Sequence, residues 1–313
     1  MKKRCIYQFL LVCISSCFLA CNGYLEEIPQ NKQKLTSTDD YEQLLNKAYL
    51  TEAVLPYIDL LTDDISYIVA DRDPRFGNVA DSYLGAYMWD NNIESTMPNG
   101  DEVFGKFYNS IYYTNVVIDE VDQAVGISSN KEETERIRGY LKGEAYALRA
   151  FRYLYLVNMY ASPYDPATSS TTPGIPINLE TSADDKPYTR EMLDKVYEQI
   201  VDDLKKAILL MEENYVNVKK NRFSPIAAKA LLARVYLYMQ EWDLAIEQAE
   251  DVIGSNSSLF DLRDEGENPI IYNENPLSYM SEDNVPGIGY LSEKNTNVLF
   301  VTGINELYMI LGG

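Results

Sequence analysis

Adjacent pairs of acidic residues are the groups in this chain with the plainest chemical use, because two carboxylates on either side of a glycosidic bond can cleave it. The pairs are Asp63–Asp64, Asp184–Asp185 and Asp202–Asp203. With 48 acidic residues in the chain, such pairs arise easily by chance, and Asp202–Asp203 is predicted on the solvated face of a helix. We therefore expect no glycosidase activity.

The other catalytic and cofactor-binding patterns are incomplete. The chain contains no histidine, which removes the commonest general base and the commonest zinc ligand. The segment Gly100–Phe107 approaches the spacing of a phosphate-binding loop, but Phe107 stands where Ser or Thr is required. The segment Asp71–Gly77 begins like a calcium loop and lacks the later Glu. The sequence therefore predicts a non-catalytic protein with no cofactor and no metal ion.

Aromatic and amide side chains gather in one loop-like stretch, residues 83–92. Sugars present flat C–H faces that stack on aromatic rings, and hydroxyl groups that pair with Asn and Asp. The candidate ligand contacts in this stretch are Tyr83, Tyr87, Trp89, Asn91 and Asn92. A second aromatic group in the C-terminal part consists of Tyr272, Tyr279 and Tyr290. The alternative for each aromatic residue is packing of a loop against helices.

Two arginines, Arg149 and Arg152, share one helical face in the least polar stretch of the chain. They could form a buried site for an anionic ligand, or they could be core ion pairs with Glu144 or with acids from a neighbouring helix. We favour ion pairs, because buried charges must be partnered. Asn115 lies on an apolar stripe and is expected to be a satisfied core amide.

The charge of the chain excludes whole classes of partner. The 48 acidic residues stand against 27 basic residues, and removal of Lys2, Lys3 and Arg4 with the N-terminal segment leaves 24 basic residues. Such a field repels nucleic acid and anionic lipid surfaces, so no nucleic-acid partner is expected. The hydrophobic content of 46% suffices for a packed core, and the 26 tyrosines suit polar organic ligands and interfaces as well as helix cores.

The first twenty residues predict a lipoprotein signal peptide. Met1–Arg4 is basic, and the uncharged run Ile6–Ala20 would reach only ~22 Å as a helix, short of the ~30 Å hydrocarbon core. Residues 18–21, Phe-Leu-Ala-Cys, resemble a bacterial lipobox, and Cys17 is a competing match. Cys21 would be the one cysteine of the mature chain, so we expect it to carry the lipid that anchors the protein to a membrane.

Helical periodicity dominates the rest of the chain. We expect helices over residues 41–50, 55–67, 101–118 and 132–160, and another that carries an apolar stripe over residues 196–211. Between Ala145 and Met159 the charges are Arg149 and Arg152 alone, so this helix should be buried on most sides. Pro- and Gly-containing stretches at 51–101 and 162–187 predict long loops.

A tetratricopeptide-like repeat is predicted next: Pro225 marks a helix start and leads into a helix over residues 226–240, and a second helix covers residues 243–253. Ala245 and Ala249 would let the two helices approach closely, while Tyr236 and Trp242 would fill the groove between helix pairs. Residues 143–160 and 190–211 suggest a looser second unit. The expected fold class is mainly α, a tetratricopeptide-like α-superhelix with long irregular loops.

Several motifs in order resemble one family. They are residues 21–29 (Cys-Asn-Gly-Tyr-Leu-Glu-Glu-Ile-Pro), 41–49, Phe107–Asn115, Gly143–Ala145, Leu148–Phe151, Gly174–Ile177 and the helix pair at 225–253. Together they resemble the SusD/RagB family of outer-membrane nutrient-binding lipoproteins. The resemblance implies a surface lipoprotein on the outer membrane that captures glycans, or less often peptides, and passes them to a SusC-like TonB-dependent transporter.

Family members usually continue well beyond this length, so we expect the C-terminal portion of the family fold to be missing. The expected organisation is a signal peptide over residues 1–20 and one SusD-like domain over residues 21–313. One alternative function is a helical-repeat scaffold, or a truncated remnant, that docks on the transporter without binding ligand. Another is a RagB-like peptide binder.

Overall fold

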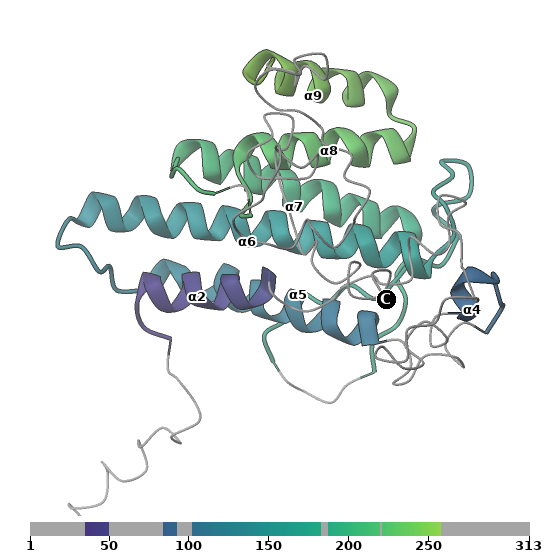
Figure 1. Ribbon diagram of the computed structural model, residues 1–313, viewed down its shortest axis with the longest axis horizontal. Coiled ribbons are helices and arrows are strands. Elements are labelled where there is room, and N and C mark those ends of the chain that lie inside the picture. Colours follow the sequence, from purple (N-terminus) through teal and green to yellow (C-terminus); the bar gives the residue numbers. More distant parts are fainter. Residues whose placement is uncertain (1–34, 50–83, 93–101, 183–186, 220, 258–313) are drawn as a thin grey trace, which may run out of the picture. The chain divides into compact units, whose positions relative to one another are not determined.

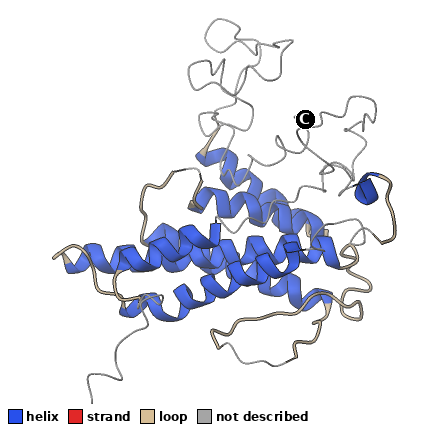
Figure 2. Ribbon diagram, turned by 60° about the horizontal axis from the view of Figure 1, so that its bottom comes forward, coloured by secondary structure: helices blue, strands red, loops and turns tan. Residues whose placement is uncertain are grey.

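The computed structural model describes residues 35–49, 84–92, 102–182, 187–219 and 221–257. The chain divides into two compact units, residues 1–36 and 37–313, and the helices described below all belong to the second unit. In the described ranges the regular elements are helices, joined by irregular connections (Figure 2). The mainly helical class predicted from the sequence is confirmed.

Apart from the short α4, the helices form a sequential array in which each packs against its neighbours in the chain (Figure 1). The elements are α2 (Thr38–Tyr49), α4 (Leu84–Tyr87), α5 (Glu102–Glu120), η4 (Val121–Gln123), α6 (Lys131–Tyr160), α7 (Leu193–Glu213), α8 (Pro225–Met239) and α9 (Trp242–Ser255). Helices α2 and α5 pack on one another and on α6, and α6 packs on α7. Helix α7 then packs on α8, and α8 on α9. This order is typical of a helical-repeat protein.

The helix starts follow from local side-chain chemistry. Asn130 caps α6 by accepting hydrogen bonds from the backbone N–H groups of Glu132 and Glu133, whose carboxylates also suit the positive end of the helix dipole. Ser224 caps α8 by accepting from the Ala227 N–H, and Pro225 occupies the first helical position, where its missing N–H costs nothing. The predicted start of α8 at Pro225 is therefore confirmed.

Helix α6 is the core of the array. Nearly every residue from Ala145 to Val157 is buried, as the scarcity of charges there predicted. Gly143 allows the close approach of α7, because a Cβ atom at this position would lie 2.8 Å from Cγ of Met211 and 3.1 Å from the carbonyl oxygen of Ala207. The packing of α6 against α7 thus explains why the Gly143–Ala145 motif begins with glycine.

The α8–α9 pair confirms the predicted repeat, with one exception. Tyr236 is buried and Ala245 is nearly so, as expected, but Trp242 is 55% exposed and does not fill a groove between helix pairs. Helix α9 is the last element in the described part of the chain, and its side chains Ile246 and Ile253 are exposed as well. The helix predicted over residues 55–67 lies outside the described residues.

Candidate ligand-binding site

Helix α4 and the turn after it carry the described part of the candidate ligand segment. The Trp89 N–H donates to the Ala86 carbonyl at 3.1 Å, and the Asp90 N–H donates to the Gly85 carbonyl at 2.9 Å. These two bonds form a Schellman motif, in which Trp89 takes the left-handed position after the helix. Glycine is the usual residue there, because an L side chain is strained in this conformation.

The backbone of Trp89 is therefore strained, and its side chain does not pack into the protein. Its φ angle is 54°, and a bulky residue in this region costs on the order of 1 kcal/mol. The side chain is nevertheless 70% exposed, and Met88 beside it is also exposed. The alternative of loop packing is thus wrong for Trp89 within the described residues. A strained, exposed tryptophan is typical of a residue kept for contact with a ligand or a partner.

Polar groups follow the tryptophan directly. Asp90, Asn91 and Asn92 are all exposed, and the Asn92 N–H donates to Oδ1 of Asp90 at 3.0 Å. This bond closes an Asx turn, which fixes the backbone after Trp89. Tyr87 is half-buried at the end of α4. The turn therefore presents one large aromatic face beside several hydrogen-bonding groups.

Several predicted site residues lie outside the described residues. They are Tyr83, Tyr272, Tyr279, Tyr290 and the predicted lipid-bearing Cys21. The acidic pairs Asp63–Asp64 and Asp184–Asp185 and the Asp71–Gly77 segment also lie there. Of the phosphate-loop near-match, Gly105 and Lys106 lie within α5, so these two residues form part of a helix rather than a loop.

Arg152 holds the end of α2, from which the chain enters the 50–101 segment. Its guanidinium donates to the carbonyl oxygens of Ala48 (3.0 Å) and Tyr49 (3.3 Å) and to Oγ of Ser110 (3.1 Å). Burial lowers the pKa of Arg152 to about 10, so it remains charged at neutral pH. The prediction of a carboxylate partner for Arg152 is therefore wrong. The backbone carbonyls at the C-terminus of α2, which carry partial negative charge, bind the guanidinium instead.

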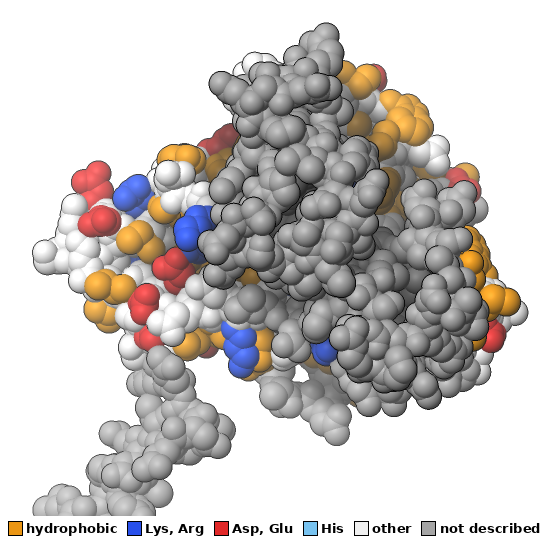
Figure 3. Space-filling view, viewed as in Figure 1, with side chains coloured by type: hydrophobic (Ala, Val, Ile, Leu, Met, Phe, Trp, Pro, Cys, Tyr) orange, Lys and Arg blue, Asp and Glu red, His pale blue; other side chains and the backbone are white. Residues whose placement is uncertain are grey.

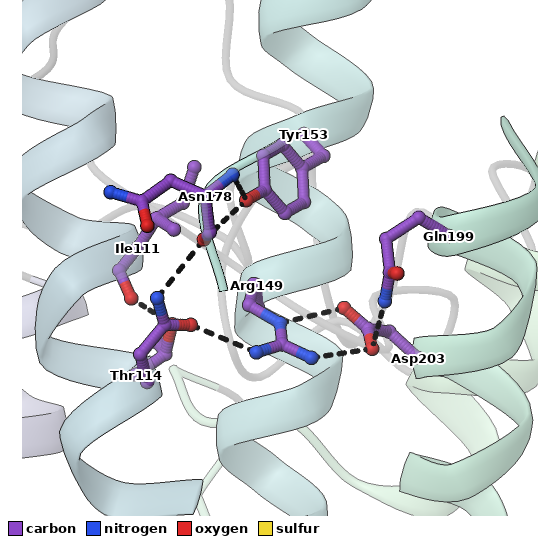
Figure 4. A network of polar contacts seen from close by, with 8 residues as sticks. Ile111, Thr114, Arg149, Tyr153, Asn178, Gln199 and Asp203 are labelled. Atoms are coloured by element: carbon purple, nitrogen blue, oxygen red, sulfur yellow. Dashed lines mark hydrogen bonds and ion pairs between the residues drawn. The ribbon is translucent and has the colours of Figure 1, made fainter. Parts of the chain in front are cut away.

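Arg149 forms the predicted core ion pair with an acid of a neighbouring helix. Its Nε and Nη2 atoms each donate to a carboxylate oxygen of Asp203, on α7, at 2.8 Å (Figure 4). Asp203 is completely buried, so its predicted place on a solvated face is wrong, whereas Asp202 is exposed. The reason is helical geometry: Asp203 lies three residues after Ile200 and four before Ala207, on the same buried stripe.

Asn115 joins this ion pair to the connection between α6 and α7. Its Oδ1 accepts from Arg149 at 2.8 Å, and its Nδ2 donates to the carbonyls of Asn178 (3.0 Å) and Glu180 (3.1 Å). The Tyr153 hydroxyl also donates to the Asn178 carbonyl and accepts from the Asn178 N–H (Figure 4). The prediction of a satisfied core amide at Asn115 is confirmed. The anion-site interpretation of Arg149 fails, because the protein's own groups occupy its guanidinium.

A second ion pair, between a buried glutamate and a half-buried arginine, was not predicted. Arg222, just before α8, makes two hydrogen bonds to the Glu144 carboxylate, one of them at 2.8 Å, and also pairs with Glu42. The Tyr49 hydroxyl donates to the same Glu144 carboxylate at 2.7 Å. Glu144 therefore partners Arg222 rather than Arg149 or Arg152. The signal available in the sequence was a lone glutamate in the mostly apolar part of α6, which requires a cation from elsewhere.

The described residues contain no group of three or more His, Cys, Asp or Glu side chains that could hold a metal ion. Among the helices of the described ranges, none is both long enough and apolar enough to cross a membrane. Every buried side-chain nitrogen or oxygen in these ranges has a hydrogen-bond partner. The frame is thus fully paired within itself, and the exposed Trp89 turn is the better candidate for ligand contact.

Comparison with known proteins gives consistent results. Residues 23–237 match the SusD-like family profile described as starch-binding and associating with the outer membrane. SusD-like protein P25 of Formosa agariphila is 23% identical over 266 residues, which cover 80% of this chain and 46% of that protein. SusD-like protein P38 of the same organism is 24% identical over 195 residues, 56% of this chain and 34% of that protein. The chain thus spans less than half the length of these curated relatives.

Solved structures share the fold. A putative sugar binding protein from Bacteroides vulgatus is 25% identical, with a TM-score of 0.60 over 74% of this chain and 50% of that one. A SusD superfamily protein from Bacteroides thetaiotaomicron is 22% identical, with a TM-score of 0.55 over 73% of this chain and 49% of that one. The tetratricopeptide-like prediction is confirmed by these likenesses.

Proposed function

We propose a glycan-capturing function from the premise that this chain belongs to the SusD-like family, whose profile is described as starch-binding and associating with the outer membrane. The protein would bind an oligosaccharide through the Trp89 turn. It would act without catalysis, because the chain has no histidine and the buried acids Glu144 and Asp203 are engaged in ion pairs.

The exposed, strained ring of Trp89 is the observation that carries this proposal. The flat C–H face of a sugar stacks on such a ring, and the side chains of Asp90, Asn91 and Asn92 lie within the next three residues to receive or donate to hydroxyl groups. Because the Schellman and Asx bonds hold the backbone on both sides of Trp89, little of the turn needs to be ordered on binding.

The proposal includes the setting of the protein. Cys21 would carry the lipid anchor, which would hold the chain on the surface of the outer membrane. The captured oligosaccharide would then pass to a SusC-like TonB-dependent transporter. The family description and the lipoprotein-like residues 1–21 support this setting.

The two tryptophans of the chain allow a direct test. Trp89 and Trp242 are the two tryptophans, and both are exposed. In a Trp242→Phe background the intrinsic fluorescence reports on Trp89, so titration with a panel of oligosaccharides should change its emission for at least one of them. Isothermal titration of the unaltered protein with the same sugar gives the affinity. Trp89→Ala should abolish binding.

Trp242→Ala is the matched control, since it removes the other exposed tryptophan, on α9, and should leave the affinity unchanged. Circular dichroism shows that each variant is folded. If no glycan of the panel binds the folded protein, or if Trp89→Ala binds as tightly as the unaltered chain, the proposal is wrong. Binding of peptides in place of glycans would point to the RagB-like alternative.

The outer face of α9 favours the scaffold as a second candidate. Trp242, Ile246 and Ile253 lie at i, i+4 and i+11, so they share one face, and all three are exposed. A terminal repeat with an apolar outer face can dock on a partner such as the transporter. In that case Ile246→Lys should reduce co-purification with the transporter from membranes, whereas Trp89→Ala should not.

A further inference from the structure

We propose that the Trp89 turn selects uncharged glycans and rejects polyanionic ones, such as those that carry uronate or sulfate groups. This inference rests on the proposed function and names the ligand class of the same site. It follows from three observations: the carboxylate directly after the tryptophan in the turn, the charge of the segment that carries the turn, and the engagement of Arg149, Arg152 and Arg222 within the frame.

The carboxylate of Asp90 is the charged group nearest to Trp89 in the sequence. Asp90 is exposed, and its Oδ1 accepts the hydrogen bond that closes the turn, which holds the carboxylate within the turn that follows the tryptophan. A carboxylate accepts hydrogen bonds from sugar hydroxyls but repels an anionic substituent on the same ring. At 4 Å in water, one such repulsion weakens binding about fivefold.

The surrounding sequence reinforces this effect. Residues 50–101 contain ten acidic residues, and their basic residues are Arg72 and Arg75 alone. The described part of this segment, residues 84–92, has no basic residue at all. The whole chain carries a net charge of −21, so the wider field has the same sign. The negative charge of the turn and the net charge of the chain would therefore both repel an approaching polyanion, within the distance that salt leaves unscreened.

Recognition of an anionic sugar needs a guanidinium or ammonium group aimed at it. Three arginines of the frame cannot supply one, because Arg149 is held by Asp203, Arg152 by the carbonyls of Ala48 and Tyr49, and Arg222 by Glu144. On the described part of the face in Figure 3, basic side chains are scattered among acidic and apolar ones and form no continuous basic area. Within residues 84–92 no basic side chain is present to pair with an anionic glycan.

Glycan pairs that differ only in charge test the inference. Suitable pairs are amylose with carboxymethyl-amylose, and fully methyl-esterified with de-esterified polygalacturonate, each titrated into the full chain by calorimetry. A wider panel of neutral and polyanionic glycans is screened in parallel. We expect the ligand that binds to be neutral and its anionic counterpart to bind at least about tenfold more weakly at low salt. The difference in affinity between the two members of a pair should become much smaller at 1 M salt, where the screening length falls to about 3 Å.

Asp90→Asn separates the local charge from the wider field. The amide retains Oδ1 as acceptor for the Asn92 N–H, so the turn is preserved, and the gap between the two members of a pair should narrow about fivefold. If a polyanionic glycan binds as tightly as its neutral counterpart at low salt, the inference is wrong while glycan capture stands. If neither charge class binds, both proposals fall together.

Discussion

Asp203→Asn should destabilise the protein strongly, because it removes the charge that faces Arg149 while leaving the shape of the side chain unchanged. Both partners are buried, with side-chain exposures of 0% for Asp203 and 5% for Arg149. Removing one partner of a buried ion pair leaves the other charge uncompensated and costs about 3–5 kcal/mol. For a domain of 150–250 residues, such a loss lowers Tm by roughly 6–20 °C.

The assay is urea unfolding of the purified protein, followed by far-UV circular dichroism. Asp202→Asn is the matched control, because the neighbouring acid is exposed on the same helix, and it should change the free energy of unfolding by less than about 0.5 kcal/mol. Hydrogen exchange provides a local readout. The Asn178 N–H, which the Tyr153 hydroxyl holds, should exchange faster in Asp203→Asn, because Arg149 also orients Asn115 toward that connection.

A double variant separates charge from packing. Arg149→Met with Asp203→Leu replaces the pair by apolar groups of similar size, so most of the loss should be recovered. Recovery should remain incomplete by about 1–3 kcal/mol, because Oδ1 of Asn115 loses its donor. If Asp203→Asn is as stable as Asp202→Asn, the ion pair does not stabilise the frame and the reasoning is refuted.

The remaining predictions concern helix contact, strain and alkaline stability. Gly143→Ala should cost about 1–3 kcal/mol of unfolding free energy, because its Cβ would press on Met211 and the Ala207 carbonyl. A Cβ atom at Gly105 in α5 would meet nothing within 4 Å, so Gly105→Ala should be neutral or stabilising by up to about 1 kcal/mol. If the two glycine variants change the free energy of unfolding in urea equally, the close approach of α6 and α7 at Gly143 is contradicted. Trp89→Gly should abolish glycan binding without lowering Tm, since glycine relieves the left-handed strain, and a lowered Tm would show that the ring packs. Burial raises the pKa of both Tyr41 and Tyr197 to about 12, above the ordinary value of 10. The stability they contribute is therefore complete below pH 10 and is lost as the pH rises from 10 to 12. Phenolate absorbance should show these two tyrosines ionising late, and the Tyr197→Phe variant should lack one late step.

The helices were predictable because their determinants are local. The apolar spacing in α5 and α7, the low charge of α6, and the Pro225 start of α8 each specify a helix within a few residues of its observed bounds. The exposure of Trp89 and the pairing of Arg149 were among the alternatives weighed from the sequence. In both cases the choice depended on where neighbouring elements lie.

The errors share one physical cause, which is that partners distant in the sequence decide burial. Asp203 looked solvated beside Asp202, although its spacing from Ile200 and Ala207 placed it on the buried stripe. Arg222 could not be assigned to Glu144, because 78 residues separate them. Arg152 donates to helix carbonyls rather than to the carboxylate that we predicted. Trp242 is exposed, and no described element after α9 packs on it.

The hydrogen bonds from Arg152 to the end of α2 also affect how freely the sequence of the 50–101 segment can change. Because α2 and α5 pack on one another, the two ends of the 50–101 segment are held together by the frame, whatever path the chain takes between them. Loop-closure entropy grows only slowly with length, so doubling such a segment would cost about 0.6 kcal/mol. Insertions, deletions and exchanges around Trp89 should therefore leave the helical array almost as stable as before. We therefore expect that the segment of a relative could replace this one, much as antibody loops are grafted onto a common framework.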